Sequence, residues 1–409
     1  MKLYVLTGLA FTLLGCMADT YAERPLTSRH SAFQIPEEYL KEPSNIPGFW
    51  VSTVEETAAF LKQRIRIGHV EEIGRSSGGR PIRAVTYGSP RQGRGTSTFS
   101  GSLGFGDVRA FRGQDHDKTV YCAMAAVHGG EFEAIVGLIN LIAVLETGHD
   151  LRGKAWPDLA AASARIDRIV LVPIANPDGR SRIPIRMQLH REGADGYKVH
   201  EWLNTGAKAD GSLIGWPQVK EHIPLDFSQV RFPGGYPNDA GVNIQHDDFL
   251  GQRQPETQAL LNLATRERPD LVLNLHTGVA MNDYYMRVHR PFSEPALNAT
   301  FDAFFTRVHT GLALAGLQST RDPAIEANPS RAPRSAYNLD TAINLHCGAL
   351  CITIESPSHG YSGTNRALQP AQQTPETLLE AQLVCHREAM QFLADTGGRA
   401  RWTARPAKP

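Results

Sequence analysis

Four apolar runs of strand length, far apart in the chain, constrain the fold more than any other feature of the sequence. They cover residues 119–127, 168–175, 271–275 and 349–354. Uninterrupted apolar runs are typical of strands that are buried on both faces of a sheet. Helical patterns lie between and after them, over residues 134–145, 255–266, 294–315 and 375–393. This alternation predicts an α/β fold: a mixed, mostly parallel twisted sheet with helices on both faces.

A polar side chain follows each of these apolar runs. The four side chains are those of His128, Asn176, His276 and Glu355. In open α/β sheets, ligands bind at the carboxyl ends of the strands. We therefore expect His128, His276 and Glu355 to meet at one edge of the sheet, although they are distant in the chain.

His128 and Glu131 form an HxxE pair, with two glycines between them that would let the backbone approach a ligand closely. Catalytic zinc takes three imidazole or carboxylate ligands and keeps a fourth position for water. The pair therefore needs a third imidazole from elsewhere in the chain. A second HxxE copy, His69 and Glu72, lies in a strand-like segment, where residues three apart point to opposite faces. Context favours the first copy, and a structural histidine is the alternative for His128.

The order and spacing of several motifs resemble those of the M14-type zinc metallocarboxypeptidase family, of which this chain would be a divergent member. The motifs are Glu72 to Ser76 followed by Gly79 to Ile82, His128 to Glu131, Asn176 to Gly179, Asn274 to Thr277, and Thr353 to Glu355. The likeness extends over residues 50–395. No single motif is specific, but the ordered set is.

The resemblance implies the zinc carboxypeptidase fold and a single bound Zn²⁺ ion. It implies that His128, Glu131 and His276 bind this ion and that Glu355 is the general base. Zinc in such a site makes a bound water more acidic and polarises the scissile carbonyl. The alternative for Glu355 is a partly exposed carboxylate in a salt bridge.

The resemblance also implies an arginine that stabilises the oxyanion and a tyrosine that covers the substrate. Arg186 and Arg191 both follow the motif at Asn176, and the spacing favours Arg191. A surface arginine is the alternative for either one. Tyr337 is similar to the covering tyrosine, with a surface or packing tyrosine as its alternative.

One motif departs from the family pattern. Gln245 and His246 stand where the family has an Asn-Arg pair that binds the terminal carboxylate of the substrate. Arginine grips a carboxylate with a planar fork that histidine lacks, and Asp247 and Asp248 add negative charge nearby. We therefore question strict specificity for a free C-terminal carboxylate. The alternative is that another arginine, such as Arg253, takes over the role.

The N-terminus has the pattern of a secretory signal. A positive start at residues 1–2 precedes a mostly apolar stretch over 3–14, which is too short to span a bilayer. The stretch leads either to a lipobox-like Cys16, which would carry a lipid anchor, or to a cleavage site after Ala22. We expect an exported protein: a periplasmic protein, a membrane-anchored lipoprotein or a secreted protein.

The remaining organisation follows from composition along the chain. We expect a signal peptide over 1–22, an irregular lead-in over 23–50, a hydrolase domain over 51–395 with a loop insertion near 180–240, and a tail over 396–409. Residues 90–117 are rich in Gly, Ser and Arg and predict a loop. No later run has the length of a transmembrane helix.

Charge and cysteine content limit the function classes. Lys plus Arg equals Asp plus Glu, at 42 each, which argues against nucleic acid as a partner. No CxxC occurs among the cysteines, so a thiolate zinc site is not expected, and a disulfide or buried free thiols both stay open. We expect a peptide or amide-bearing substrate. The alternatives are a catalytically silent peptide- or glycan-binding protein and, without a GxSxG motif, a disfavoured serine or cysteine hydrolase.

Overall fold

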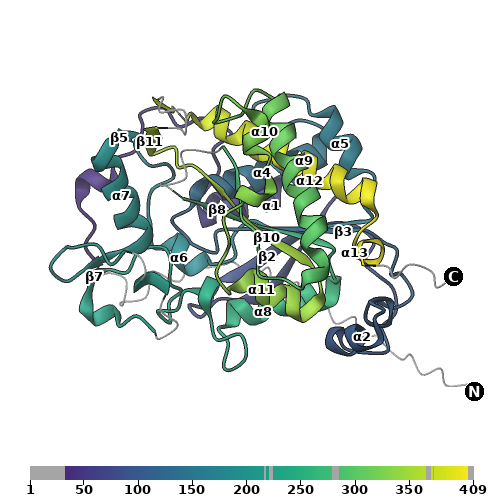
Figure 1. Ribbon diagram of the computed structural model, residues 1–409. Coiled ribbons are helices and arrows are strands. Elements are labelled where there is room, and N and C mark those ends of the chain that lie inside the picture. The colour runs from purple at the N-terminus through teal and green to yellow at the C-terminus, as the bar shows by residue number, and fades with distance from the viewer. Residues whose placement is uncertain are drawn as a thin grey trace, which may run out of the picture. The chain divides into compact units, whose positions relative to one another are not determined.

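A seven-stranded mixed sheet forms the centre of the computed structural model, in the order β1-β2-β4-β3-β8-β10-β9 (Figure 1). Its strands are β1 (His69–Arg75), β2 (Pro81–Gly88), β3 (Val120–Ala125), β4 (Arg168–Val172), β8 (Leu271–Thr277), β9 (Arg287–Val288) and β10 (Leu350–Ser356). The central strands β4, β3, β8 and β10 are parallel, and the pairs toward both edges are antiparallel. The predicted mixed α/β sheet is confirmed, with its parallel part at the centre.

The central strands are buried almost along their whole length, as their apolar runs predict, and the exception is Glu355 near the end of β10. Every residue of β3, β4 and β8 is buried. Alternate residues of β3 point to opposite faces of the sheet. Cys122 and Met124 join the apolar cluster that includes residues of α8 and α11, whereas the Tyr121 hydroxyl lies 2.7 Å from His386 Nδ1 on α12. Both faces of the sheet therefore carry a core.

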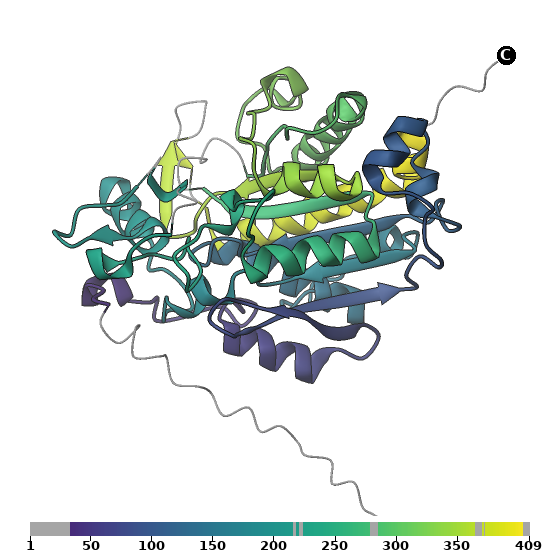
Figure 2. The same ribbon diagram turned by 90° about the horizontal axis from the view of Figure 1, so that it is seen from below.

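Helices cover both faces of this sheet (Figures 1 and 2). The first face carries α4 (Phe132–Thr147), α5 (Pro157–Ser163), α9 (Asn298–Leu314) and α12 (Pro375–Thr396), and α1 (Val54–Arg64) packs against α4. The second carries α8 (Pro255–Glu267), α11 (Leu339–Cys347) and α2 (Phe99–Phe105). The predicted helices therefore exist, with bounds that differ by a few residues.

Shorter elements complete the chain. They are α3 (Arg109–Arg112), β5 (Arg191–Glu192), α6 (Pro177–Ser181), α7 (Gly193–Thr205), β6 (Ala207–Lys208), β7 (Val230–Phe232), α10 (Pro323–Glu326), β11 (Tyr361–Thr364), β12 (Pro370–Ala371), α13 (Arg399–Trp402) and 3₁₀ turns that include Ile244–His246. The β5, β11 and β12 strands form a separate small sheet, and β6 pairs with β7.

Three stretches differ from the sequence prediction. The 180–240 insertion is not only loops, because it contains α7, whose Val199, Trp202 and Leu203 are buried at helical spacing. Polar residues between them and two glycines earlier in the helix hide that pattern in the sequence. The predicted loop 90–117 contains α2 and α3. In the predicted tail, Arg399 of α13 is buried.

The structure describes residues 33–215, 218–220, 224–278, 285–364, 370–371 and 373–403. The predicted signal, with its alternatives at Cys16 and Ala22, lies outside these residues, so export stays a prediction. Within the described ranges, none of the helices has the length and apolar character needed to cross a membrane. Four cysteines are buried free thiols, namely Cys122, Cys347, Cys351 and Cys385.

One buried carboxylate, that of Asp178, links two of the motifs in space. It accepts hydrogen bonds from the backbone N–H of Gly78 at 2.8 Å and of Asp239 at 3.1 Å, and Arg80 Nη1 lies 2.8 Å from it. Ser76 also donates to it. Two motifs distant in the chain are therefore joined beneath the sheet edge through Asp178, which is 0% exposed.

We predict that Asp178→Asn lowers the free energy of unfolding by about 3 kcal/mol, because the amide would turn a donor toward groups that are themselves donors. Urea denaturation measures this change. The matched control is Asp117→Asn, whose carboxylate is 78% exposed and should change stability by about 0.5 kcal/mol or less. Equal stability of both variants would contradict the role given to Asp178.

Candidate metal centre

A short loop between β3 and α4 carries two of the three metal-binding candidates. Strand β3 ends at Ala125, the chain turns through a positive φ of 51° at Ala126, and Glu131 is the N-cap of α4. His128 lies between these points. The turn at the start of the helix lets His128 and Glu131 face the same point, as the HxxE spacing predicts.

The two glycines of this loop are required for packing against the protein, and not for the close approach of a ligand that the sequence predicted. A Cβ on Gly129 would lie 2.1 Å from the backbone N of Arg180, and one on Gly130 would lie 2.6 Å from Asn204 Oδ1. The Gly129 N–H also donates to Gly235 O at 2.7 Å. The glycines therefore allow the loop to pack against neighbouring chain segments rather than against a ligand.

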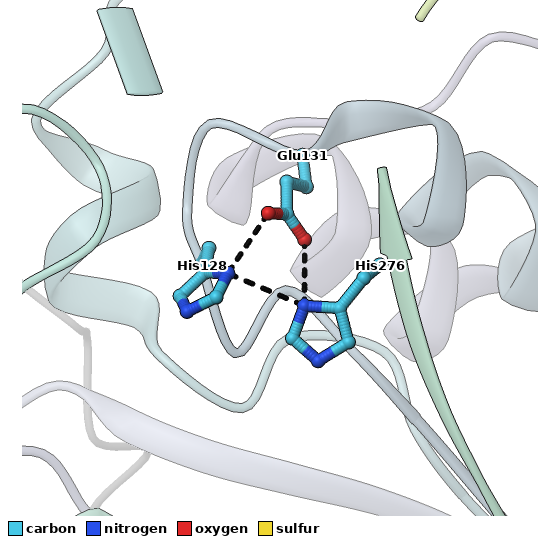
Figure 3. Close-up of side chains that lie close together, drawn as sticks. All are labelled: His128, Glu131 and His276. Carbon is cyan, nitrogen blue, oxygen red and sulfur yellow. Dashed lines mark hydrogen bonds and ion pairs between the residues drawn. The ribbon is translucent and has the colours of Figure 1, made fainter. Parts of the chain in front are cut away.

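Three side chains converge at the carboxyl ends of the strands, as Figure 3 shows. His128 Nδ1 lies 2.8 Å from Glu131 Oε1, and His276 Nδ1, from β8, lies 3.0 Å from Glu131 Oε2. The two Nδ1 atoms are 3.2 Å apart. All three residues are buried. The structure thus brings together the three residues that the sequence proposed as ligands.

The donor set fits zinc. Zinc binds imidazole nitrogen at about 2.0–2.1 Å, so two ligand atoms around a tetrahedral ion lie about 3.3 Å apart. The three distances of 2.8, 3.0 and 3.2 Å are within a few tenths of an ångström of this spacing. Two imidazoles and one carboxylate form a typical catalytic zinc set, and they hold a site for one Zn²⁺ ion.

Asn243 orients His128 for this role. His128 Nε2 lies 3.1 Å from Asn243 Oδ1, which also accepts the backbone N–H of Gln245 at 3.0 Å, while Asn243 Nδ2 donates to Val219 O. An amide oxygen at Nε2 places the proton on Nε2, so a neutral ring presents the Nδ1 lone pair to Glu131 Oε1. Two lone pairs at 2.8 Å would repel each other, so a proton or a metal ion belongs between them, and this tautomer of His128 is the one that a metal ion at Nδ1 needs.

At His128 and Glu131, electrostatics favour the protonation states that a metal needs. Burial lowers the pKa of His128 and so favours its neutral form. Burial alone would raise the pKa of Glu131, but His128 and His276 outweigh it and hold that pKa well below its ordinary value. The Thr277 N–H also donates to Glu131 Oε2 at 3.1 Å. Glu131 is therefore a carboxylate despite its burial.

Glu355 lies on the strand next to His276. The two residues are register partners in the parallel pair of β10 and β8, so their side chains share one face of the sheet. Its side chain is 22% exposed, and Oε2 lies 3.3 Å from His289 Nε2. Burial would raise the pKa of Glu355, but His289 and His276 together lower it more, so the pKa lies below its ordinary value.

The two candidate arginines contact groups outside the metal site. Arg191, in β5, donates to Glu38 O and lies 3.4 Å from Asp195. Arg186 forms an ion pair with Glu56, and its Nη2 donates to Trp50 O. These contacts do not bring either guanidinium to the three ligands, so the oxyanion role stays a prediction.

The candidate substrate-binding residues Gln245, His246 and Tyr337 differ in how far they are exposed. Gln245 is buried, and its Oε1 accepts from Asn274 Nδ2 at 3.0 Å, behind His276 on β8. His246 is half-buried in the same 3₁₀ turn. Tyr337 is 53% exposed and immediately precedes Asn338, the N-cap of α11. No contact in the structure tests their roles.

Sequence reasoning missed three residues of the site. Asn243 and Tyr236 contact the ligand His128, and His289 contacts Glu355. Tyr236 stacks on His128 with ring centroids 3.7 Å apart. Asn243 lies two residues before Gln245, in the stretch that departs from the family pattern, so its position could have marked it as a candidate. Tyr236 and His289 reach the site only through tertiary contacts and carry no local signal.

Comparison with known proteins shows which family and fold this site belongs to. A sequence model described as zinc carboxypeptidase matches residues 54–310, more than half of the chain, including all three ligands but not Glu355. A metallo-carboxypeptidase from Burkholderia cenocepacia has the same fold, with a TM-score of 0.51, 18% identity, and coverage of 84% of this chain and 70% of that chain.

A metallo-carboxypeptidase from Pseudomonas aeruginosa, solved with (2-guanidinoethylmercapto)succinic acid, is also similar, with a TM-score of 0.47 and 16% identity. The match covers 84% of this chain and 68% of that chain. Among curated proteins, none matches the sequence.

We predict that Asn243→Ala weakens zinc binding by about 10- to 100-fold, because His128 loses the acceptor that holds its ring orientation. Competition with a chromogenic chelator measures the affinity. Asn262→Ala, at an exposed position on α8, is the matched control and should leave the affinity unchanged. An unaltered affinity for Asn243→Ala would remove its orienting role.

Proposed function

Because the chain belongs to the zinc carboxypeptidase family, we propose that this metallopeptidase cleaves a peptide or amide bond with Glu355 as its general base. The observation that carries the proposal is the register of β8 and β10, in which Glu355 is the partner of the zinc ligand His276. Neighbouring strands lie about 4.8 Å apart, so a carboxylate at this position is within reach of a water at the metal site.

When bound at these residues, zinc would supply Lewis-acid chemistry, making a water more acidic and polarising the scissile carbonyl. In our proposal Glu355 accepts the proton of that water and then delivers it to the leaving amine. Its partial exposure of 22% supports access by a substrate. His128, Glu131 and His276 hold the metal, and Asn243 keeps the His128 ring in place.

We predict that Glu355→Gln keeps one zinc ion per chain but lowers kcat by about 10²- to 10⁴-fold, because an amide cannot accept the proton. Steady-state kinetics and metal analysis of the same preparation measure both quantities. Glu72→Gln, in the second HxxE copy, is the matched control, since Glu72 is paired with Arg75 on β1 and should not affect turnover. Near-normal turnover of Glu355→Gln would sink the proposal.

The second part of the proposal concerns specificity: a free C-terminal carboxylate is not strictly required. Gln245 and His246 offer no guanidinium fork, and the Gln245 amide oxygen is already bonded to Asn274. Arg253, the alternative carboxylate ligand, bonds to Phe249 O at 2.8 Å and contacts Gln258. A neutral group on the leaving side of the substrate is consistent with these contacts.

We predict that a peptide and its C-terminally amidated twin are cleaved with kcat/KM values within about tenfold of each other, which is about 1.4 kcal/mol of discrimination. A bidentate arginine–carboxylate contact would give a much larger difference. Product analysis by mass spectrometry at matched concentrations measures the ratio. A preference above about 100-fold for the free carboxylate would overturn this part of the proposal.

A further inference from the structure

The proposed general base has a histidine beside it that no sequence motif singles out. His289 Nε2 lies 3.3 Å from Glu355 Oε2, and the two side chains are 15% and 22% exposed. Partial burial reduces solvent screening, so this contact is stronger than the same pair at an open surface. The imidazole of His289 is therefore placed to influence the orientation of the Glu355 carboxylate.

The edge strand β9 fixes the position of His289. Glu355 is the register partner of Arg287 across the antiparallel pair of β10 and β9, and the His289 N–H donates to Thr353 O at 3.0 Å. Residues at paired positions and at two-residue steps share one face of a sheet. His289 therefore lies diagonally beside Glu355, on the side of β10 opposite to the strand of His276.

We propose that His289 is a positioning residue for Glu355: its Nε2 holds Oε2 of the carboxylate and leaves Oε1 available to accept the proton. This inference rests on the proposed role of Glu355 as the base. A carboxylate held in one orientation loses less freedom on reaching the transition state, which favours turnover rather than substrate binding.

The length of the contact between His289 and Glu355 is consistent with a distance that shortens when substrate binds. At 3.3 Å the pair is an ion-pair contact, and Nε2 is not aligned as a hydrogen-bond donor. Contacts between catalytic groups are often long without substrate and shorten in the complex. The backbone of His289 already holds β9 through Thr353, so a side-chain substitution leaves that bond in place.

The test compares His289→Gln with His289→Asn. The amide nitrogen of glutamine lies about where Nε2 does in histidine, whereas the asparagine amide is too short to reach Glu355. We expect His289→Asn to lower kcat by about 10- to 100-fold with KM within about twofold, and His289→Gln to stay within about fivefold of the parent. Steady-state kinetics use the peptide established in the free-acid and amide comparison.

Controls separate this inference from the function on which it rests. His116→Asn removes a partly exposed imidazole that pairs with Asp117 at 3.2 Å, away from the proposed site, and it should leave kcat unchanged. Zinc content and cooperative unfolding are measured for every variant. Equal kcat losses in His289→Gln and His289→Asn, a rise in KM alone, or no change in His289→Asn each overturn the positioning role.

Glu355→Gln is assayed alongside. If it stays active, the proposed function fails; if it is inactive while His289→Asn matches the parent, only the positioning role fails. Should His289→Asn not fold, the His289→Gln variant is compared with His289→Leu, which removes the donor while keeping apolar bulk, under the same criteria.

Discussion

The buried carboxylate of Glu131 is the interaction on which the site depends. At 1% exposure, a lone carboxylate would cost several kcal/mol, and it is tolerated because two imidazoles and the Thr277 N–H surround it. The same arrangement collects three metal ligands. The groups that compensate for the burial of Glu131 are thus the same groups that would bind zinc. This arrangement holds only while β3, α4 and β8 keep their relative positions.

The Asn176 to Gly179 motif maintains those positions rather than taking part in chemistry. Asn176 Nδ2 donates to Val127 O at 3.3 Å and to Tyr236 O at 3.1 Å, and so ties the His128 loop to the segment that carries Tyr236. Asp178 joins the same region to the turn at Gly78. The family resemblance therefore rests in part on residues that hold the ligand-bearing segments in place.

The 180–240 insertion and the chain just after it belong to the site more than their loop-like sequence indicates. Tyr236 stacks on His128, and Asn243 accepts from its second nitrogen. On the other side of the sheet edge, the two-residue strand β9 brings His289 to Glu355. Tyr236, Asn243 and His289 thus come from segments without a recognisable motif, and they reach the site because the chain returns to the sheet edge at these points.

The sequence by itself determined the central sheet, because apolar runs buried on both faces admit few other structures. It also predicted that His128, Glu131 and His276 would meet, because parallel strands end at one edge and the ordered motifs resemble those of the zinc carboxypeptidases. It did not determine the contacts of Arg186 and Arg191, the helix α7, or the roles of Asn243 and His289. Those depend on the packing of segments far apart in the chain, where a hydrogen-bond partner or an edge-strand register decides which way a side chain faces, and no local pattern of residues encodes that choice.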